Sequence, residues 1–274
     1  MRILLAGGGT GGHIYPALAI AERLKDLHPE CEILYVGTQK GLENRIVPQR
    51  GVPFQTIAVE GLPRKISPAL VKAVGRAIGG CMDAKKIIKR FQPDLVIGTG
   101  GYVCGPVVLS AHLAGVPAMI HEQNAFPGVT NKILARFVDK IMVNFKASEK
   151  YFVHKERICV TGLPVRQEVL RTNRQEGLDY FGFSADKNTL LISGGSRGAR
   201  SINRAMAKAY PQLLKESGLQ ILHLTGAVDY EDTLQAIAAE NIDLNDYPQL
   251  IVKPYLDEMQ YGLAAADFVV GRAG

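Results

Sequence analysis

The clearest chemical potential in the sequence lies in a run of glycines that ends in a histidine, Gly7-Gly8-Gly9-Thr10-Gly11-Gly12-His13. Glycine leaves main-chain N–H groups uncovered and permits positive φ angles. A loop of this kind between a strand and a helix N-terminus favours a phosphate or another anion. Histidine titrates near neutral pH, so His13 is a candidate for taking a proton from a hydroxyl group. Alternatively, His13 is a neutral residue at the helix start, hydrogen-bonded to the main chain.

Two polar clusters that follow apolar segments are further site candidates. The first, Gly98-Thr99-Gly100-Gly101-Tyr102, is a second glycine loop, although a tight turn with Tyr102 packed on the core explains it equally well. The second is His121-Glu122-Gln123-Asn124. Proteins of the α/β class keep their chemistry at the carboxyl ends of strands, which favours a functional role for this cluster. Glu122 is alternatively a structural partner of His121.

A third glycine loop, Ser193-Gly194-Gly195-Ser196-Arg197-Gly198, repeats the anion-binding pattern later in the chain. Arg197 and the nearby Arg200 could contact an anion there. The alternative is that both arginines are simply solvated.

Glycine loops of this kind occur in proteins that bind a nucleotide cofactor, so this function is considered first. Gly7, Gly9 and Gly12 fit the dinucleotide fingerprint G-x-G-x-x-G, which also expects an acidic residue at the end of the second strand to hold a ribose. Here that strand ends in Tyr35-Val36-Gly37-Thr38, and the next acid is Glu43. The P-loop pattern G-x-x-x-x-G-K-[ST] does not occur in the sequence. A phosphate-bearing substrate is therefore favoured over NAD(P).

These loops must be positioned by strands and helices that alternate along the whole chain, a pattern that predicts parallel sheets with helical crossovers. We expect strands near residues 2–6, 32–36, 54–59, 94–97, 117–120, 140–143, 157–161, 189–192, 220–224, 250–252 and 267–270. We expect helices near residues 16–27, 41–50, 67–90, 105–114, 127–137, 199–216, 230–239 and 257–266. Gly75, Gly79 and Gly80 predict a break within the third of these helices.

The strand, glycine loop and helix pattern begins twice, which predicts an α/β protein with two Rossmann-like domains, residues 1–163 and 164–274. Two such domains would bind ligands in a cleft at the carboxyl ends of their strands. The last residues, Gly271-Arg272-Ala273-Gly274, resemble a loop that leads into a further helix. The second domain is therefore expected to be incomplete in this chain.

The composition is that of an ordinary globular protein, because 47% of the 274 residues are hydrophobic and 21% are charged. No apolar run reaches the roughly 18 residues that suggest a membrane span. The first residues form a strand without a leader pattern, so secretion is not expected. The cysteines form no C-x-x-C pair and are expected to be reduced thiols of a cytosolic protein: Cys31, Cys81, Cys104 and Cys159.

Positive charge is concentrated in residues 64–90, which hold eight basic residues and one acidic residue, while the net charge of the whole chain is +6. The apolar residues of this segment share a helical face: Leu70, Val71, Val74, Ile78 and Met82. An anionic membrane surface would suit such a helix. Alternatively, the apolar face packs on the protein's own sheet. Nucleic acid is not expected, since no aromatic residue lies between the basic ones and no nucleic-acid motif is present.

Five motifs occur in order along the chain: Gly8-Gly9-Thr10-Gly11-Gly12-His13, Gly98-Thr99-Gly100-Gly101-Tyr102, His121-Glu122-Gln123-Asn124, Gly162-Leu163-Pro164-Val165-Arg166 and Gly194-Gly195-Ser196-Arg197-Gly198-Ala199-Arg200. Together they resemble the MurG family, within glycosyltransferase family 28. The resemblance implies a GT-B fold, with the active site between two Rossmann-like domains. It also implies an inverting transfer of GlcNAc from UDP-GlcNAc to the C4 hydroxyl of MurNAc in lipid I, giving the lipid II of peptidoglycan synthesis.

The resemblance implies specific roles for residues, with His13 as the general base. Contacts with UDP-GlcNAc are implied for Thr10, Gly11, Gly12, Asn124, Arg166, Ser196 and Leu256. Contacts with the acceptor or its pyrophosphate are implied for Gly9, Gly100, Gly101, Tyr102, His121 and Glu122. Membrane association is expected for Val71, Lys72, Val74, Arg76, Ile78, Lys85 and Lys86.

The resemblance implies no bound metal or cofactor, because UDP-GlcNAc is a substrate. The implied partners are UDP-GlcNAc, lipid I, the anionic cytoplasmic face of the plasma membrane, and proteins of cell-wall synthesis and division. One alternative is a related GT-B enzyme that glycosylates diacylglycerol, against which the second glycine loop and the His121–Asn124 cluster argue. An inactive fragment that still binds lipid-linked substrate or partners is a second alternative. A nucleotide-dependent oxidoreductase is the third.

Overall fold

The structure is a computed structural model that describes residues 1–60, 68–195 and 198–272 and, within these ranges, the side chains of all but residues 68–77. The chain divides into two compact units, Met1–Arg166 (unit 1) and Gln167–Gly274 (unit 2). We expected the boundary after Leu163, close to this division. Each unit is described by itself.

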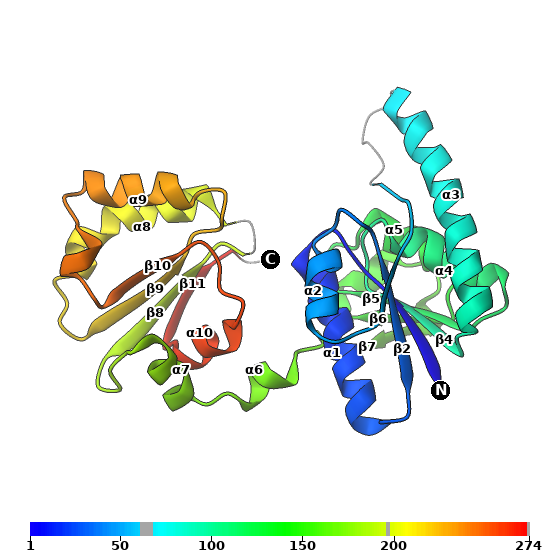
Figure 1. The fold of residues 1–274 in the computed structure, drawn as a ribbon, viewed down its shortest axis with the longest axis horizontal. Coiled ribbons are helices and arrows are strands. Elements are labelled where there is room, and N and C mark those ends of the chain that lie inside the picture. The colour runs from blue at the N-terminus through cyan, green and yellow to red at the C-terminus, as the bar shows by residue number, and fades with distance from the viewer. Residues whose placement is uncertain (61–67, 196–197, 273–274) are drawn as a thin grey trace. The chain divides into compact units, whose positions relative to one another are not determined.

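Unit 1 is built on a parallel sheet with the strand order β3-β2-β1-β4-β5-β6-β7 (Figure 1). Its strands are β1 (Arg2–Ala6), β2 (Glu32–Gly37), β3 (Phe54–Thr56), β4 (Leu95–Gly98), β5 (Ala118–Glu122), β6 (Lys140–Val143) and β7 (Ile158–Val160). The strand order reverses direction between β1 and β4, since β2 lies on one side of β1 and β4 on the other. At such a switch point the loops that follow the two strands open a crevice for ligands.

Helices cover both faces of this sheet. Successive side chains of a strand point to opposite faces, so the apolar strands of a parallel sheet need a cover on each side. They are α1 (Gly11–Leu27), α2 (Glu43–Gln49), α3 (Pro68–Phe91), α4 (Cys104–Leu113) and α5 (Val129–Leu134), with short 3₁₀ helices η1 (Lys146–Tyr151) and η2 (Lys155–Arg157). Ile3 and Leu5 of β1 pack with α1 and α2 on one face. Leu4 and Ala6 pack with α3, α4 and α5 on the other face.

Helix α3 is continuous, so the predicted break within it is wrong. A Cβ atom at Gly80 would collide with the side chain of Val59, whereas one at Gly79 would meet nothing within 4 Å. Gly80 therefore lets the helix approach the segment that follows β3. The helix tolerates the glycines, each of which costs about 1 kcal/mol relative to alanine, because its apolar face, including Ala84, Ile87 and Ile88, is buried on the sheet.

Unit 2 repeats the architecture on a smaller parallel sheet with the order β10-β9-β8-β11 (Figure 1). Its strands are β8 (Asn188–Ser193), β9 (Leu219–Leu224), β10 (Leu250–Lys253) and β11 (Phe268–Gly271). Its helices are α6 (Gln167–Arg171), α7 (Arg174–Phe181), α8 (Arg200–Leu213), α9 (Tyr230–Ala239) and α10 (Met259–Ala265), with the 3₁₀ helix η3 (Leu244–Asp246). Helices α8 and α9 pack on one face, and α7 and α10 on the other.

Helices α6 and α7 fall in a polar stretch where we predicted no helix. The start of α7 carries a capping box, in which the Asn173 side chain accepts from Glu176 N (3.0 Å) and the Glu176 carboxylate accepts from Asn173 N (2.8 Å). The pattern Asn-x-x-Glu in the sequence was the available signal for this helix.

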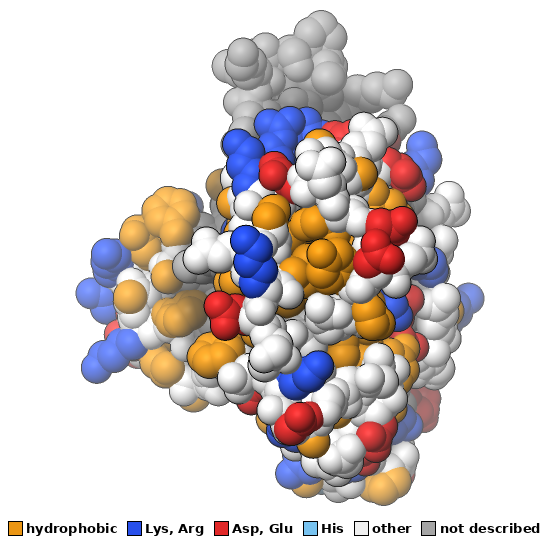
Figure 2. All heavy atoms as spheres, turned by 90° about the vertical axis from the view of Figure 1, so that its left-hand side faces the viewer, with side chains coloured by type: hydrophobic (Ala, Val, Ile, Leu, Met, Phe, Trp, Pro, Cys, Tyr) orange, Lys and Arg blue, Asp and Glu red, His pale blue; other side chains and the backbone are white. Residues whose placement is uncertain are grey.

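The face drawn in Figure 2 carries side chains of several kinds. Figure 2 shows apolar side chains reaching the surface on one face, with basic and acidic ones among them. The edge strand β11 contributes exposed apolar residues, Phe268, Val269 and Val270.

Candidate active site

Two glycine loops of unit 1 lie against each other because their strands are neighbours. Loop 1 (Gly7–Gly12) follows β1 and loop 2 (Gly98–Tyr102) follows β4, and Ala6 pairs with Gly98 in the sheet. The loops are joined by hydrogen bonds from Thr99 N to Ala6 O (2.8 Å) and from Gly8 N to Gly100 O (3.4 Å). Gly101 has a φ of +83°, and a Cβ atom there would collide with Gly8 O. This close contact makes the two loops one structural element.

A buried thiol reinforces the same contact. Cys104 Sγ lies 2.9 Å from Ala6 O and 3.0 Å from Gly100 O, and it accepts a hydrogen bond from Gly100 N (3.1 Å). Burial raises the pKa of the Cys104 thiol to about 12. The sulfur therefore keeps its hydrogen at neutral pH and can donate it to one of the two carbonyl oxygens.

His13 is half-buried in the first turn of α1 and faces loop 2. Its Nδ1 atom lies 3.1 Å from the main-chain oxygen of Thr99. A carbonyl oxygen only accepts hydrogen bonds, so Nδ1 carries the proton of the neutral ring and Nε2 carries a lone pair. Thr99 Oγ1 in turn donates to His13 O (2.7 Å). The imidazole is thus oriented by loop 2, in the tautomer that a general base needs at Nε2.

The polar cluster His121–Asn124, at the end of β5, reaches the same carbonyl. Gln123 Nε2 donates to Thr99 O (2.7 Å) and lies 3.2 Å from His121 Nδ1. His121 is fully buried and its Nε2 lies 3.0 Å from Gly162 O. Burial lowers the pKa of His121, so the ring is neutral, donates from Nε2 and accepts at Nδ1. Gln123 and Thr99 belong to the predicted clusters, although no role was predicted for either of them, and they connect this cluster to His13.

Glu122 is 1% exposed, and its carboxylate is used inside the protein. One oxygen accepts from Asn124 N and Nδ2 (2.9 Å each), and the other accepts from Asn131 Nδ2 (2.9 Å) and Gly128 N (3.1 Å). These bonds shape the turn that presents Asn124, whose side chain is exposed. The carboxylate of Glu122 is therefore bound by Asn124, Gly128 and Asn131, whereas the His121 ring contacts Gly162 and Gln123. Contacts of His121 and Glu122 with the acceptor stay a prediction.

The other predicted site residues of unit 1 lie around loop 1. Thr10 and Gly12 are exposed, and α1 begins between them at Gly11. The N–H groups of Gly11 and Gly12 precede the first hydrogen bonds of the helix, which run from His13 N (3.1 Å) and Ile14 N (3.2 Å) to Thr10 O. The Tyr102 ring covers Gly9, since a Cβ atom there would lie 3.3 Å from Tyr102 Cε1. The guanidinium of Arg166 lies 4.7 Å from the ring centroid of Tyr15, on α1. Arg166 is therefore held beside the helix that loop 1 opens.

Glu43 is a residue of this site that the sequence analysis missed. It is fully buried, and its carboxylate accepts from Gly9 N (3.0 Å) and from Thr38 N (3.0 Å) and Oγ1 (2.8 Å). We noted it only as an acid too far along the chain to hold a ribose. It lies in the first turn of α2, from where its side chain turns back to loop 1.

In unit 2, the third glycine loop follows β8, at the switch point between β9 and β11. Arg272 donates from Nε (3.0 Å) and Nη2 (2.6 Å) to Gly194 O, which fixes the start of this loop. Gly198 has a φ of +77° and lies against Thr225 O, where a Cβ atom would collide. The candidate donor residue Ser196 and its neighbour Arg197 lie outside the described residues.

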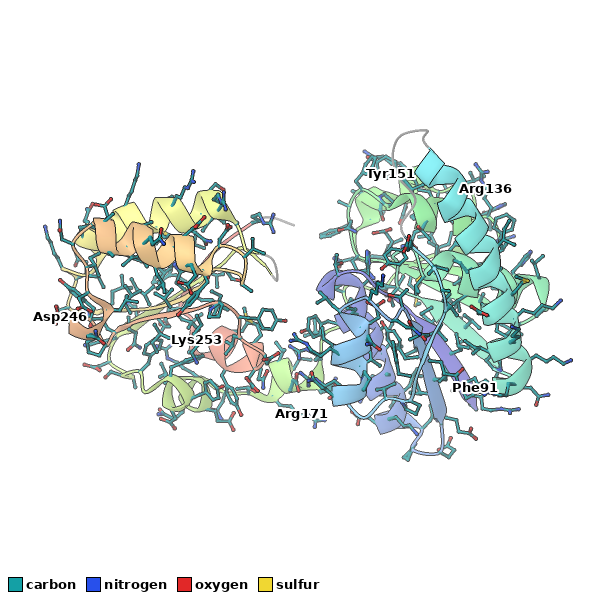
Figure 3. The ribbon with its side chains drawn as sticks, turned by 45° about the horizontal axis from the view of Figure 1, so that its top comes forward. Phe91, Arg136, Tyr151, Arg171, Asp246 and Lys253 are labelled. Atoms are coloured by element: carbon teal, nitrogen blue, oxygen red, sulfur yellow. The ribbon has the colours of Figure 1, made fainter. Side chains whose placement is uncertain are left out.

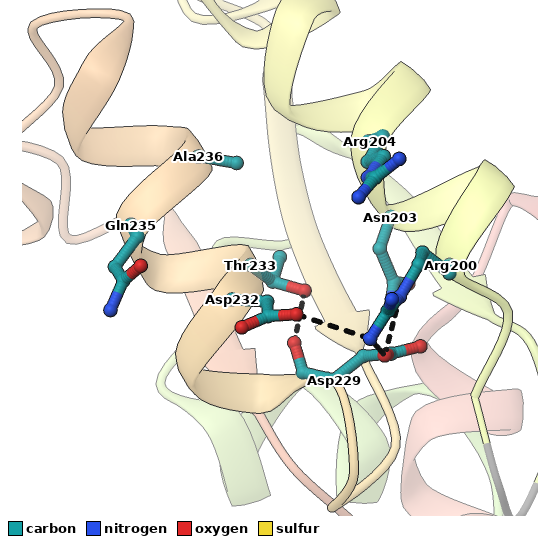
Figure 4. A pocket seen from close by; sticks show the side chains of 8 residues that line it. All are labelled: Arg200, Asn203, Arg204, Asp229, Asp232, Thr233, Gln235 and Ala236. Carbon is teal, nitrogen blue, oxygen red and sulfur yellow. Dashed lines mark hydrogen bonds and ion pairs between the residues drawn. The ribbon is translucent and has the colours of Figure 1, made fainter.

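Arg200 lines a pocket between α8 and α9, where its side chain has acidic partners (Figure 4). Its Nε donates to Asp229 (3.0 Å) and its Nη2 to Asp232 (3.1 Å). The Arg200 side chain is 56% exposed and is ion-paired with these two carboxylates rather than simply solvated.

A buried chain of hydrogen bonds ends at Thr225 O, against which Gly198 of the third glycine loop lies. Tyr210 Oη lies 2.6 Å from His223 Nδ1, His223 Nε2 lies 3.0 Å from Asn203 Oδ1, and Asn203 Nδ2 donates to Thr225 O (2.9 Å). Burial lowers the pKa of His223 to about 4, so the ring is neutral. Because the Asn203 oxygen can only accept, Nε2 of His223 donates and Nδ1 accepts from the tyrosine.

Leu256 packs in the core of unit 2. Its side chain is buried with Leu178, Leu191 and Leu222. Its contact with the donor stays a prediction, for which the main chain is the more accessible part. Nearby, Lys253 at the end of β10 (Figure 3) has its ammonium group 5.9 Å from the ring centroid of Tyr180.

The basic helix α3 exposes part of its apolar face. Ile78 is 61% and Met82 is 58% exposed, next to the exposed Lys85 and Lys86. The alternative that this face packs on the sheet is therefore wrong for Ile78 and Met82. The side chains of the other four expected membrane residues lie outside the described ones: Val71, Lys72, Val74 and Arg76. In the described part of the chain, no helix is both long enough and apolar enough to cross a membrane.

Two parallel-sheet units, each with a glycine loop between its first strand and the helix that follows, define a protein of the GT-B class, and comparison with known proteins agrees. Residues 3–143 match the glycosyltransferase family 28 N-terminal domain, and residues 189–274 match the family's C-terminal domain. The chain belongs to glycosyltransferase family 28.

Curated relatives are similar over the whole chain. The UDP-N-acetylglucosamine--N-acetylmuramyl-(pentapeptide) pyrophosphoryl-undecaprenol N-acetylglucosamine transferase of Desulforamulus reducens is 53% identical over 274 residues, which are 100% of this chain and 74% of the relative. The protein of the same name from a Thermoanaerobacter species is 49% identical with the same coverage.

Solved structures agree with these relatives. The crystal structure of MurG from Acinetobacter baumannii superposes with a TM-score of 0.68 at 29% identity, covering 100% of this chain and 74% of that one. A putative UDP-N-acetylglucosamine 2-epimerase from Listeria monocytogenes gives a TM-score of 0.67 at 11% identity with the same coverage, which shows a shared fold alone.

Proposed function

We propose that the protein transfers GlcNAc from UDP-GlcNAc to the C4 hydroxyl of the MurNAc unit of lipid I, giving lipid II for peptidoglycan synthesis. The names of the relatives at 53% and 49% identity support this activity. The observation that carries it is the orientation of His13 beside two glycine loops: Nδ1 is bound to Thr99 O, which directs the lone pair to Nε2.

In the proposed reaction the acceptor hydroxyl attacks the anomeric carbon of GlcNAc from the face opposite to UDP. The new C–O bond forms as the bond to the UDP oxygen breaks, so the anomeric configuration is inverted. Nε2 of His13 takes the hydroxyl proton, and UDP leaves with the bonding electron pair. A positioned general base contributes typically 10²–10⁴-fold to the rate of such a step.

The loops provide the remaining groups. The acceptor pyrophosphate would bind main-chain N–H groups of loops 1 and 2, with Tyr102 beside it. Donor contacts are proposed for the exposed Thr10, Gly12 and Asn124 and for Arg166. Main-chain N–H groups and a guanidinium stabilise the negative charge that develops on a departing diphosphate.

The lipid-linked acceptor requires the protein to work at a membrane surface. Exposed Ile78 and Met82 beside Lys85 and Lys86 suit peripheral association with an anionic leaflet. We place the protein at the cytoplasmic face of the plasma membrane. Proteins of cell-wall synthesis and division are the further partners that the family resemblance implies.

Transfer of radiolabelled GlcNAc from UDP-GlcNAc to a soluble lipid I analogue, measured with the full-length protein, tests the proposal. We expect a labelled product with the mobility of a lipid II analogue and none when lipid I is replaced by diacylglycerol. Absence of transfer together with tight binding of NAD(H) would overturn the proposed activity in favour of an oxidoreductase.

A further inference from the structure

We propose that Glu43 is a positioning residue of the active site, whose buried carboxylate holds loop 1 in its ligand-binding shape. It is fully buried, although it carries a carboxylate and lies on the first turn of a helix at the surface of the sheet. A buried carboxylate is stable only where donors surround it. The groups that face it explain how this one is accommodated.

Each hydrogen bond to Glu43 comes from a donor. Oε2 accepts from Gly9 N (3.0 Å), and Oε1 accepts from Thr38 N (3.0 Å) and from Thr38 Oγ1 (2.8 Å). Thr38 Oγ1 itself accepts from Gly41 N (3.1 Å), which leaves its hydrogen for the carboxylate. A carboxylate only accepts hydrogen bonds, so its chemistry matches this set of donors. The amide group of glutamine would place an N–H₂ against one of them.

Glycines make the space for this side chain. A Cβ atom at Gly8 would lie 2.6 Å from Oε1, and one at Gly37 would lie 2.5 Å from Cγ. At Gly41 it would collide with both carboxylate oxygens. Three chain segments, loop 1, the end of β2 and the turn before α2, thus close around one carboxylate. Glycine at these three positions is explained by Glu43 rather than by a bound phosphate.

Glu43 binds Gly9, which lies just before the helix that carries His13. Gly9 has a φ of +86°, is covered by the Tyr102 ring, and precedes Thr10, the N-cap of the helix α1 that carries His13. Fixing Gly9 N–H therefore fixes the entry into α1. It also removes this N–H from anion binding and puts negative charge on the β2 side of the loop.

This arrangement determines which ligand loop 1 can take. In a dinucleotide-binding loop the acid after the second strand holds a ribose and the loop is open to the pyrophosphate. Here the side chain of Glu43 instead points toward loop 1 and binds the N–H group of Gly9. A substrate phosphate must then use the N–H groups beyond Gly9, at the start of α1, next to His13. Glu43 is in this way a determinant of specificity as well as of shape.

Hydrogen exchange of the Gly9 amide tests the proposal without reference to any catalytic activity. In the ¹⁵N-glycine-labelled full-length protein, Gly9 N–H should exchange at least tenfold more slowly than the N–H of Gly12, which is exposed in the first turn of α1. Equal exchange rates of the two amides in the wild-type protein would overturn the proposal.

Variants then assign the protection to the carboxylate. Glu43→Gln should speed exchange at Gly9 about tenfold or more, and Glu43→Asp, which keeps the charge one methylene further back, should have a smaller effect. The matched control is Glu32→Gln, because Glu32 is exposed at the start of β2. A Glu43→Gln variant that folds with unchanged exchange at Gly9 would contradict the proposal.

A kinetic measurement separates positioning from general stability, and this arm rests on the proposed function. Glu43→Gln should lower kcat for GlcNAc transfer about tenfold while KM for UDP-GlcNAc changes less than about twofold. If kcat falls, KM rises by a similar factor and the melting temperature is lower, Glu43 only stabilises the fold. If the wild-type protein transfers no GlcNAc, the proposed function fails, whereas the exchange experiment still decides the role of Glu43.

Discussion

The side chains of His13 and Gln123 share a single acceptor, the main-chain oxygen of Thr99, at 3.1 Å and 2.7 Å respectively. The two residues lie in different segments, at the start of α1 and just after β5, and loop 2 passes between them. The Thr99 carbonyl can orient His13 only while loop 2 keeps its position. The hydrogen bond from Gln123 connects loop 2 to the end of β5 and so helps to keep it there.

Replacing Gln123 by alanine should therefore impair catalysis without disturbing the donor site. Loss of one hydrogen bond costs typically about 1 kcal/mol, so kcat is expected to fall about five- to tenfold with KM for UDP-GlcNAc nearly unchanged. Steady-state kinetics on the full-length protein provide the measurement, with Gln49→Ala, an exposed residue on α2, as the control. A variant with wild-type kcat would mean that His13 is oriented without Gln123.

Replacing His13 by alanine should lower kcat about 10²–10⁴-fold, because the acceptor hydroxyl loses its general base. Donor affinity, measured by isothermal titration calorimetry with UDP-GlcNAc, should change much less. Unchanged turnover would remove His13 from the proposed mechanism, and an equal loss of binding and turnover would indicate that it contacts the donor instead.

The buried His223 should make unit 2 sensitive to acid. Its pKa is lowered to about 4 by burial, whereas the exposed ring in the unfolded chain titrates near 6.5. Between these values the unfolded chain binds more protons than the folded one, so the free energy of unfolding falls as the pH drops from 6.5 to 4 and falls no further through this group below pH 4. The loss amounts to about 3 kcal/mol.

Two measurements check this prediction. Titration of the His223 ring by NMR should give a midpoint near 4, and urea unfolding of His223→Gln should depend less on pH between 4 and 6.5 than that of the wild type. A normal midpoint near 6.5 would show that the ring is accessible to water in solution.

Charge reversal on α3 should weaken membrane binding. Each basic residue near an anionic surface contributes about 1 kcal/mol, so Lys85→Glu with Lys86→Glu should lower the partition coefficient on phosphatidylglycerol vesicles at least tenfold. Lys208→Glu with Lys215→Glu, at exposed positions of unit 2, makes the same change in net charge and serves as the control in a vesicle sedimentation assay. Equal binding of the two double variants would exclude α3 as the contact surface.

Much of the fold could be predicted because hydrophobic alternation and glycine punctuation are local signals. The strand of residues 140–143 and the helix of residues 230–239 were placed at their observed bounds, as β6 and α9. The break in α3 was predicted from the low helix propensity of glycine. It does not occur, because the sequence does not show that Gly80 packs against Val59 and that the helix is buried on the sheet. Tertiary contacts outweighed local propensity here.

The site was predictable only in part, for a similar reason. Loop 1, loop 2 and the cluster at the end of β5 could be found as motifs, because each combines glycine or polar residues with the end of a strand. The roles of Glu43 and Gln123 depend on where their side chains turn, and Leu256 appears in a polar segment although its side chain is in the core. Spacing along the chain does not contain this information.

The thiol of Cys104 has a practical consequence for chemical modification. It is fully buried against loops 1 and 2, and its high pKa keeps it out of the thiolate form that alkylating agents and oxidants attack. Cys159, by contrast, is exposed on β7, away from both loops in the strand order. A maleimide dye should therefore label Cys159, near one edge of the sheet, and spare Cys104 and with it the two loops.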